Sequence, residues 1–193
     1  HETPIEDVLP ITLELRDEFR KLSVAIVVAI DRSGSMSMPV EGGRTKIQLA
    51  GLGAAAVVDL LTPLDQFGAI AVDTAPHTIV GLTSLDNPAS VSSRVRGIRS
   101  EGGGIAIYPA LLGATRMIAP AEAGTKHIIV FADAADSTDP GDMANLLRNA
   151  SDAGITVSVV ALGSERDPSV PLLRRVVDLG GGRLLFTNDA RLL

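Results

Sequence analysis

Short apolar runs alternate with longer amphipathic stretches along most of this chain. The clearest run, Val24–Ile30, is continuous and rich in β-branched residues, which is typical of a strand buried on both faces. Further apolar runs predict strands over residues 67–72, 127–132, 155–162 and 183–187.

The stretches between these runs predict helices. The stretch 142–153 has apolar residues at positions i, i+3, i+4 and i+7, namely Met143, Leu146, Leu147 and Ala150. Similar stretches predict helices over 45–61, 108–118 and 168–179, the last of them ended by the glycines 180–182. A short helix capped by Asn87, with Pro88 at its first position, is expected to end near Gly97.

This order of elements predicts an α/β fold. Strands that alternate with helices form a mostly parallel, six-stranded, doubly wound sheet of the Rossmann-like kind, with helices on both faces. Residues 77–82 form the remaining strand, and the segment that joins them to 67–72 is too short for a parallel crossover. We therefore expect one antiparallel strand, 77–82, at the edge of the sheet.

Residues 1–20 differ from the rest of the chain. Apolar and polar residues alternate over 9–15, which fits either a half-buried edge strand or a linker. We expect residues 1–20 to be an N-terminal extension or linker and 21–193 to be one domain, because 193 residues suit a single domain. The start at His1, without an initiator Met, indicates a segment of a longer protein whose other domains tether it.

Composition narrows the classes of function. The net charge is −6 and no basic run occurs, which argues against a nucleic-acid partner. The absence of cysteine excludes disulfides and thiolate metal sites. The run Val24–Ile30 is far shorter than the roughly 20 residues that cross a bilayer, so we expect no membrane contact by this domain itself.

The candidate chemistry lies at the carboxyl ends of the strands, where open α/β sheets bind their ligands. Asp31, Ser33 and Ser35 follow the first buried strand at spacings of two, and in an extended turn they can direct three oxygens to one point. Carboxylate and hydroxyl oxygens suit a magnesium-like ion. Asp133 ends another strand and can complete the site, and Asp73 is a further candidate. The plain alternative is a turn that Asp31 caps.

Asp31-Arg-Ser-Gly-Ser-Met36 after an apolar strand resembles the signature of von Willebrand factor A domains, which have a metal-ion-dependent adhesion site. The resemblance extends over about 24–187, with Phe131-Ala-Asp133 and the loop 102–111 at matching places. It implies that Asp31, Ser33, Ser35 and Asp133 hold Mg²⁺, or Mn²⁺ or Ca²⁺ in its place. It also implies that the loop glycines Gly102, Gly103 and Gly104 take part in ligand binding.

The sequence departs from this family at one position of the site. The family's second loop supplies a Thr ligand, which should fall at Ile105 or Ala106, and neither residue has a side-chain oxygen. A backbone carbonyl of 102–104, a water molecule or Asp73 can replace it, or the site is weakened or lost. Reduced metal affinity is therefore expected.

The resemblance implies binding, not catalysis. A partner protein would supply an acidic side chain to the open coordination position of the metal. A metal-free scaffold is the alternative, and an enzyme that uses the same ion is a third reading. The segment Glu6–Pro10 also resembles large bacterial membrane-anchored proteins, so we expect a membrane-associated parent protein, while the compartment stays undetermined.

Overall fold

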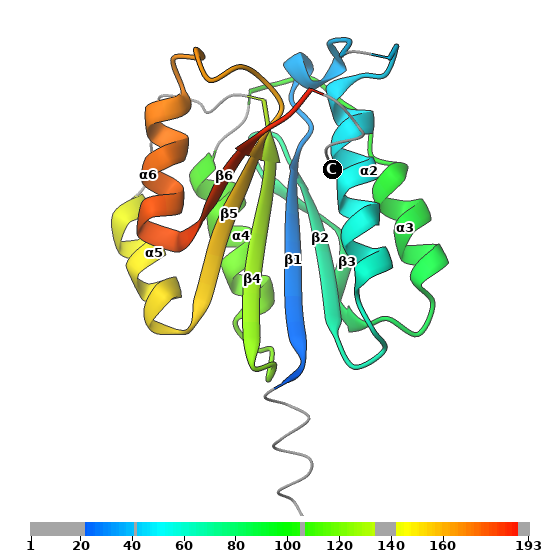
Figure 1. Ribbon diagram of the computed structural model, residues 1–193, viewed down its shortest axis with the longest axis vertical. Helices are drawn as coiled ribbons and strands as arrows, with labels where there is room; N and C mark the ends of the chain where they lie inside the picture. Colours follow the sequence, from blue (N-terminus) through cyan, green and yellow to red (C-terminus); the bar gives the residue numbers. More distant parts are fainter. Residues whose placement is uncertain (1–21, 41, 105–106, 134–141, 189–193) are drawn as a thin grey trace, which may run out of the picture.

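A six-stranded sheet runs through the centre of the molecule in the computed structural model, which describes residues 22–40, 42–104, 107–133 and 142–188 (Figure 1). The strands lie in the order β3-β2-β1-β4-β5-β6. All neighbouring strands are parallel except β2 and β3. Their bounds are β1 Val24–Asp31, β2 Gln66–Val72, β3 Pro76–Ser84, β4 Thr125–Ala132, β5 Ile155–Ala161 and β6 Gly181–Phe186. The predicted fold class, with its antiparallel edge strand, is confirmed.

Helices cover both faces of the sheet (Figure 1). Helices α2 and α3 pack on one face, and α4, α5 and α6 pack on the other. Strand β1 contributes to both cores, because Val27 and Ala29 point into one and Val28 and Ile30 into the other. The helices span α2 Lys46–Leu60, α3 Pro88–Arg96, α4 Ile107–Ile118, α5 Met143–Asp152 and α6 Val170–Gly180, and a 3₁₀ turn, η1, spans Gly34–Ser37.

Polar side chains cap several helices, as the sequence suggests. Thr45 and Gln48 form a capping box at the start of α2. Asn87 accepts from the N–H of Ser90 at the start of α3, and Asp142 caps α5 in the same way. None of the described helices is both long and apolar enough to span a bilayer.

The junction between α6 and β6 differs from the prediction. Gly180 is the last residue of α6, and β6 begins at Gly181, which has a φ of 64°, so no separate glycine segment lies between them. A Cβ at Gly180 would lie 2.7 Å from Cβ of Val157, and one at Gly182 would overlap the Val157 carbonyl. The glycines therefore allow the helix-to-strand turn to pack directly against β5.

The first residue of α6 also differs from the prediction. The helix begins at Val170 rather than at Pro168. The reason is local, because the carboxylate of Asp167 accepts hydrogen bonds from the N–H and the hydroxyl of Ser169, at 2.9 Å and 2.6 Å. Such a turn competes with helical hydrogen bonding, so the first helical turn begins at a later residue.

The strand order places a topological switch beside β1. From β1 the chain first builds β2 and β3 on one side and then returns to add β4 on the other. Strands β1 and β4 pair in parallel with Ile30 opposite Phe131, so they end side by side at the top of Figure 1. Ligands of open α/β sheets bind at such a point.

Candidate metal centre

The loop after β1 directs its polar groups inward. Asp31 is the last residue of β1, and its Oδ1 accepts from the N–H of Ser33 at 2.7 Å. Ser33 directly precedes the 3₁₀ turn η1, in which Met36 is completely buried and anchors the loop. The hydroxyls of Ser33 and Ser35 lie 3.1 Å apart. The turn therefore gathers one carboxylate and two hydroxyls, as the spacing predicts.

The loop after β4 supplies the second carboxylate. The hydroxyl of Ser35 donates to Oδ1 of Asp133 at 2.9 Å, although the two residues are 98 positions apart. Asp31, Ser33 and Asp133 are only 1%, 2% and 6% exposed, whereas Ser35 lies at the surface. The structure thus brings together all four residues predicted as metal ligands.

One oxygen of Asp31 has no partner. Its Oδ2 is buried and accepts no hydrogen bond among the described residues. Burial, with a smaller contribution from the negative charge of Asp133, raises the pKa of Asp31 to about 6. A buried carboxylate oxygen without a donor is costly, and a cation is the kind of partner that would satisfy it.

This donor set fits a hard divalent cation. It offers carboxylate and hydroxyl oxygens at one point and no nitrogen or sulfur ligand, which suits Mg²⁺, Mn²⁺ or Ca²⁺. No group of three or more His, Cys, Asp or Glu side chains that could hold a metal occurs in the described part of the chain. The centre has only two carboxylates and relies on hydroxyls, which is the composition the sequence predicts.

The sequence interpretation missed one charged member of the centre, Lys46. It is the first residue of α2, and its Nζ donates to Oδ2 of Asp133 at 2.8 Å. The Lys46 side chain is 18% exposed and that of Asp133 only 3%. A cationic residue in the first turn of a helix interacts unfavourably with the helix dipole. Its unfavourable position was the one indication in the sequence that Lys46 contacts another part of the fold.

The loop that contains Gly102–Gly104 packs against the backbone of the loop after β1. The Ser100 hydroxyl donates to the carbonyl of Ser33 at 2.6 Å, and the N–H of Gly34 donates to the carbonyl of Gly103 at 3.3 Å. Gly102 and Gly103 have φ values of 90° and 79°, which favour glycine. Gly102 and Gly103 thus border the first loop, while Gly104 has no close neighbour at its Cβ position. Ile105 and Ala106, where the family's Thr is expected, lie outside the described residues.

The carboxylate of Asp73 bonds residues outside the group formed by Asp31, Ser33, Ser35 and Asp133. Its Oδ2 accepts from Nε and Nη2 of Arg32 at 2.9 Å and 2.7 Å, and its Oδ1 accepts from the N–H of Ala75 and lies 3.3 Å from His77. The Ala75 N–H and the Arg32 guanidinium hold the pKa of Asp73 well below its usual range. Within the described residues its contacts lead to Arg32, Ala75 and His77 rather than to Asp31 or Asp133.

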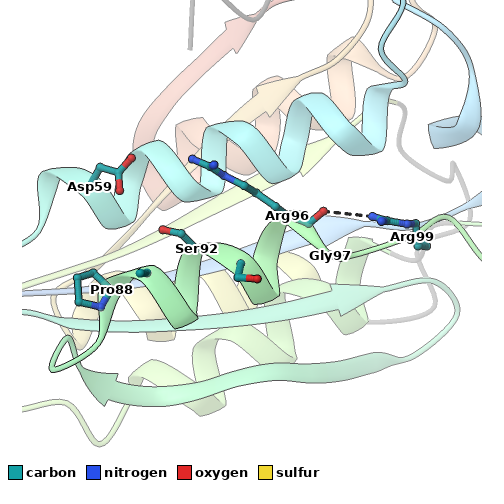
Figure 2. A pocket seen from close by; sticks show the side chains of 8 residues that line it. Asp59, Pro88, Ser92, Arg96, Gly97 and Arg99 are labelled. Carbon is teal, nitrogen blue, oxygen red and sulfur yellow. Dashed lines mark hydrogen bonds between the residues drawn. The ribbon is translucent and has the colours of Figure 1, made fainter.

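A separate hollow of about 730 Å³ lies on the flank formed by α2 and α3 (Figure 2). In Figure 2, Asp59 faces it from α2, and Ser92 and Arg96 face it from α3, while Arg99 bonds the carbonyl of Arg96. Among the described residues, Asp59 is the only acidic residue that lines it, and no histidine does. This hollow therefore lacks the oxygen ligands that the loops after β1 and β4 provide.

Comparisons with known proteins support the fold. The crystal structure of BatB from Bacteroides thetaiotaomicron is similar, with a TM-score of 0.73, 22% identity, and coverage of 86% of this chain and 91% of that one. An aerotolerance-related membrane protein from Bacteroides fragilis has a TM-score of 0.70, 20% identity, and coverage of 88% and 94%. These likenesses show the fold.

A third similar structure is proximal thread matrix protein 1 of the mussel byssus, described as having a zinc-occupied MIDAS motif. It has a TM-score of 0.71 and 16% identity, and the match covers 89% of this chain and 43% of that one. No curated protein sequence matches the chain. The family model of the von Willebrand factor type A domain matches residues 25–179, and the chain therefore belongs to that family.

Proposed function

We propose that this chain binds an acidic side chain of a partner protein through a divalent cation held by Asp31, Ser33, Ser35 and Asp133. Members of the family are protein-interaction modules. We propose in addition that the interaction of this chain depends on a divalent cation. The observation that supports it best is Oδ2 of Asp31, which is buried and has no hydrogen-bond partner among the described residues, on a carboxylate whose other oxygen accepts from Ser33. The zinc-occupied motif of the mussel protein is consistent with it.

Each residue has a distinct part in this binding mode. Asp31 would supply the charged oxygen, with Oδ1 kept in place by the N–H of Ser33. The two serine hydroxyls would contribute neutral oxygens, and Asp133 would bind directly or through water. A bound Mg²⁺ would supply an open coordination position for a carboxylate. The surrounding loops, including Gly102–Gly104, would select the partner.

Isothermal titration with MgCl₂ and MnCl₂ tests the proposal. We expect binding heat for the wild-type chain and for Asp59→Asn, which removes an exposed carboxylate from the far end of α2. We expect none for Asp31→Ala. A crystal soaked in Mn²⁺ should show anomalous scattering beside Asp31, Ser33 and Ser35. Absence of both heat and anomalous signal at millimolar metal would refute the proposal.

A second candidate is a scaffold that works without a cation, and the ion pair between Lys46 and Asp133 favours it. In this arrangement the protein supplies its own positive charge to one of the two carboxylates. The thermal midpoint distinguishes the candidates, because a ligand that binds only the native state raises it. A scaffold should melt at the same temperature in chelator and in Mg²⁺.

The proposal describes binding without turnover, by a domain of a larger membrane-associated protein. A base suited to catalysis would have to be Asp73 or Asp133, and both are already engaged by cationic side chains. Hydrolysis of generic phosphate esters that is lost in Asp133→Asn would contradict this part of the proposal. The membrane association rests on the resemblance of Glu6–Pro10, and the similar protein from B. fragilis is itself described as a membrane protein.

A further inference from the structure

We propose that Lys46 is a built-in competitor of the divalent cation: its ammonium occupies the Asp133 side of the centre and must leave when the cation binds. This inference rests on the proposed function and concerns the control of the same site. It makes Lys46 the residue that sets cation affinity, although Lys46 is not itself a ligand.

The contacts of Asp133 are the first argument. Its Oδ1 accepts from Ser35 at 2.9 Å and its Oδ2 accepts from Lys46 at 2.8 Å, so both oxygens are engaged. Asp31, in contrast, has a buried oxygen with no partner in the described part of the chain. The lysine therefore satisfies one carboxylate and leaves the other open, and a cation that engages Asp133 directly must displace a hydrogen bond.

Charge is the second argument. Asp31 and Asp133 together offer two negative charges, and Lys46 offsets one of them at hydrogen-bonding distance. The Asp133 side chain is almost entirely buried, so solvent screens this ion pair much less than a surface pair. An ammonium beside a divalent cation would be repelled strongly at that depth. The two positive charges therefore exclude each other from the centre.

Space is available beside Lys46 for its displaced side chain. A cavity of about 330 Å³ borders Lys46 and is lined by Pro39, Val40, Lys46, Gly163, Ser164 and Asn188. Asp167 lies within electrostatic reach of Lys46. Hydrogen bonds from Ser169 are the main cause of the lowered pKa of Asp167, and the Lys46 charge lowers it further. Asp167 is thus a second carboxylate whose negative charge acts on Lys46.

The test compares the full chain with Lys46→Met, which keeps the length of the side chain and removes its charge. Lys46→Gln is the second variant in case Lys46→Met folds poorly. Lys126→Met is the matched control, because among the described residues the Lys126 side chain donates to the carbonyl of Ala119, at the opposite end of the sheet. Mn²⁺ affinity is measured by titration calorimetry at constant pH, and the thermal midpoint is measured in chelator and in saturating Mn²⁺.

We expect Lys46→Met to bind Mn²⁺ about tenfold more tightly than the wild type, equivalent to about 1.4 kcal/mol. Its midpoint in chelator should fall, since Asp133 loses its counter-ion, and most of this loss should be recovered in Mn²⁺. The control should match the wild type in both measurements.

Two results would overturn the inference, and they have different meanings. If the wild type and Lys46→Met bind Mn²⁺ with equal affinity, Lys46 does not compete, and the proposed function stands. If no variant binds Mn²⁺ at millimolar concentration, the inference and the proposed function fail together. A purely structural role of Lys46 would lower the midpoint in both conditions without raising the affinity.

Discussion

Two buried aspartates at opposite ends of the sheet have pKa values that are shifted in opposite directions. Asp31 ends β1 at the carboxyl edge and is 1% exposed, while Asp65 lies just before β2 at the amino edge and is 7% exposed. Burial raises the pKa of Asp31 to about 6. At Asp65 burial acts in the same sense, but hydrogen bonds from Thr62 and Val24 outweigh it and lower the pKa.

Hydrogen bonds lower the pKa of both carboxyl groups, but at Asp31 the effect of burial outweighs them and the negative charge of Asp133 adds to it. Asp65 accepts from the N–H and the hydroxyl of Thr62 and from the N–H of Val24, each at 2.8 Å. Asp31 accepts from the N–H of Ser33, and its other oxygen has no partner. Asp65 therefore stabilises the fold by tying the start of β1 to the turn before β2. Asp31 instead has a raised pKa, which is a cost in stability of the kind that is common at binding sites.

The largest stability change is expected for Asp65→Asn. The amide would keep one acceptor oxygen and turn an N–H₂ group toward donors, so the buried bonds to Thr62 and Val24 would be lost in part. We expect a loss of about 3 kcal/mol in the free energy of unfolding, measured by urea denaturation. The exposed Asp86→Asn serves as control and should change it by less than about 0.5 kcal/mol. An equal effect of both would remove the contrast between structural and binding aspartates.

The next effect should have the opposite sign. Asp31→Asn removes a buried charge that is ionised at pH 7, so the variant in chelator should be more stable than the wild type by about 1 to 2 kcal/mol. The gain is limited because the new amide N–H₂ would find no acceptor. The same variant should lose any stabilisation by Mg²⁺. A less stable variant would show that Asp31 supports the fold as Asp65 does.

The pH dependence in chelator sharpens the comparison. A carboxyl group whose pKa is raised in the folded state binds protons more tightly there, so its contribution to stability is lost as pH rises. For Asp31 this loss falls between its ordinary value of 3.8 and about 6. Asp65 acts in the opposite sense, because its stabilisation is lost as pH falls below 3.8.

The difference between the wild type and Asp31→Asn isolates this effect. The half-buried His127 has a pKa lowered by burial and adds stability as pH rises in a nearby range, but it is common to both proteins. We expect the stability advantage of Asp31→Asn, measured by urea denaturation, to be small at pH 4 and to grow up to pH 6.5. A pH-independent difference would show that the charge of Asp31 has no cost in the folded protein.

The smallest stability effect is expected for Ser35→Ala. Ser35 is exposed and its main partner is Asp133, so its removal should lower the free energy of unfolding by less than about 1 kcal/mol. Its effect on Mn²⁺ affinity should be much larger, because the variant loses a ligand. The exposed Ser37→Ala is the matched control, since Ser37 bonds only the carbonyl of Gly34. An unchanged affinity in Ser35→Ala would remove Ser35 from the ligand set.

The apolar patterns were sufficient for the fold because they are local. The run at 24–30 predicts a strand buried on both faces, and the structure places successive residues of β1 in opposite cores. The short link between β2 and β3 predicts their antiparallel pairing. The glycines 180–182 end α6 as predicted, but β6 already begins at Gly181, and this close junction depends on contact with Val157 on another strand.

The candidate site divides in the same way. Asp31, Ser33 and Ser35 could be grouped from the sequence, since a turn after a strand brings i, i+2 and i+4 together. Asp133 could be added because adjacent parallel strands end at the same edge of the sheet. Lys46 could not, since its contact with Asp133 spans 87 positions and depends on how α2 packs on the sheet.

The sequence by itself thus determined the order of strands and helices, the fold class and the four oxygen-bearing residues at the end of β1 and β4. Only the tertiary structure decided which of the buried carboxylates are satisfied. Asp65 accepts three hydrogen bonds, and Asp133 accepts hydrogen bonds from a serine and a lysine. Asp31 has one oxygen without a partner among the described residues. The physical reason is that hydrophobic periodicity records which face of an element is buried. The partners of a buried charge are set by contacts between elements far apart in the chain.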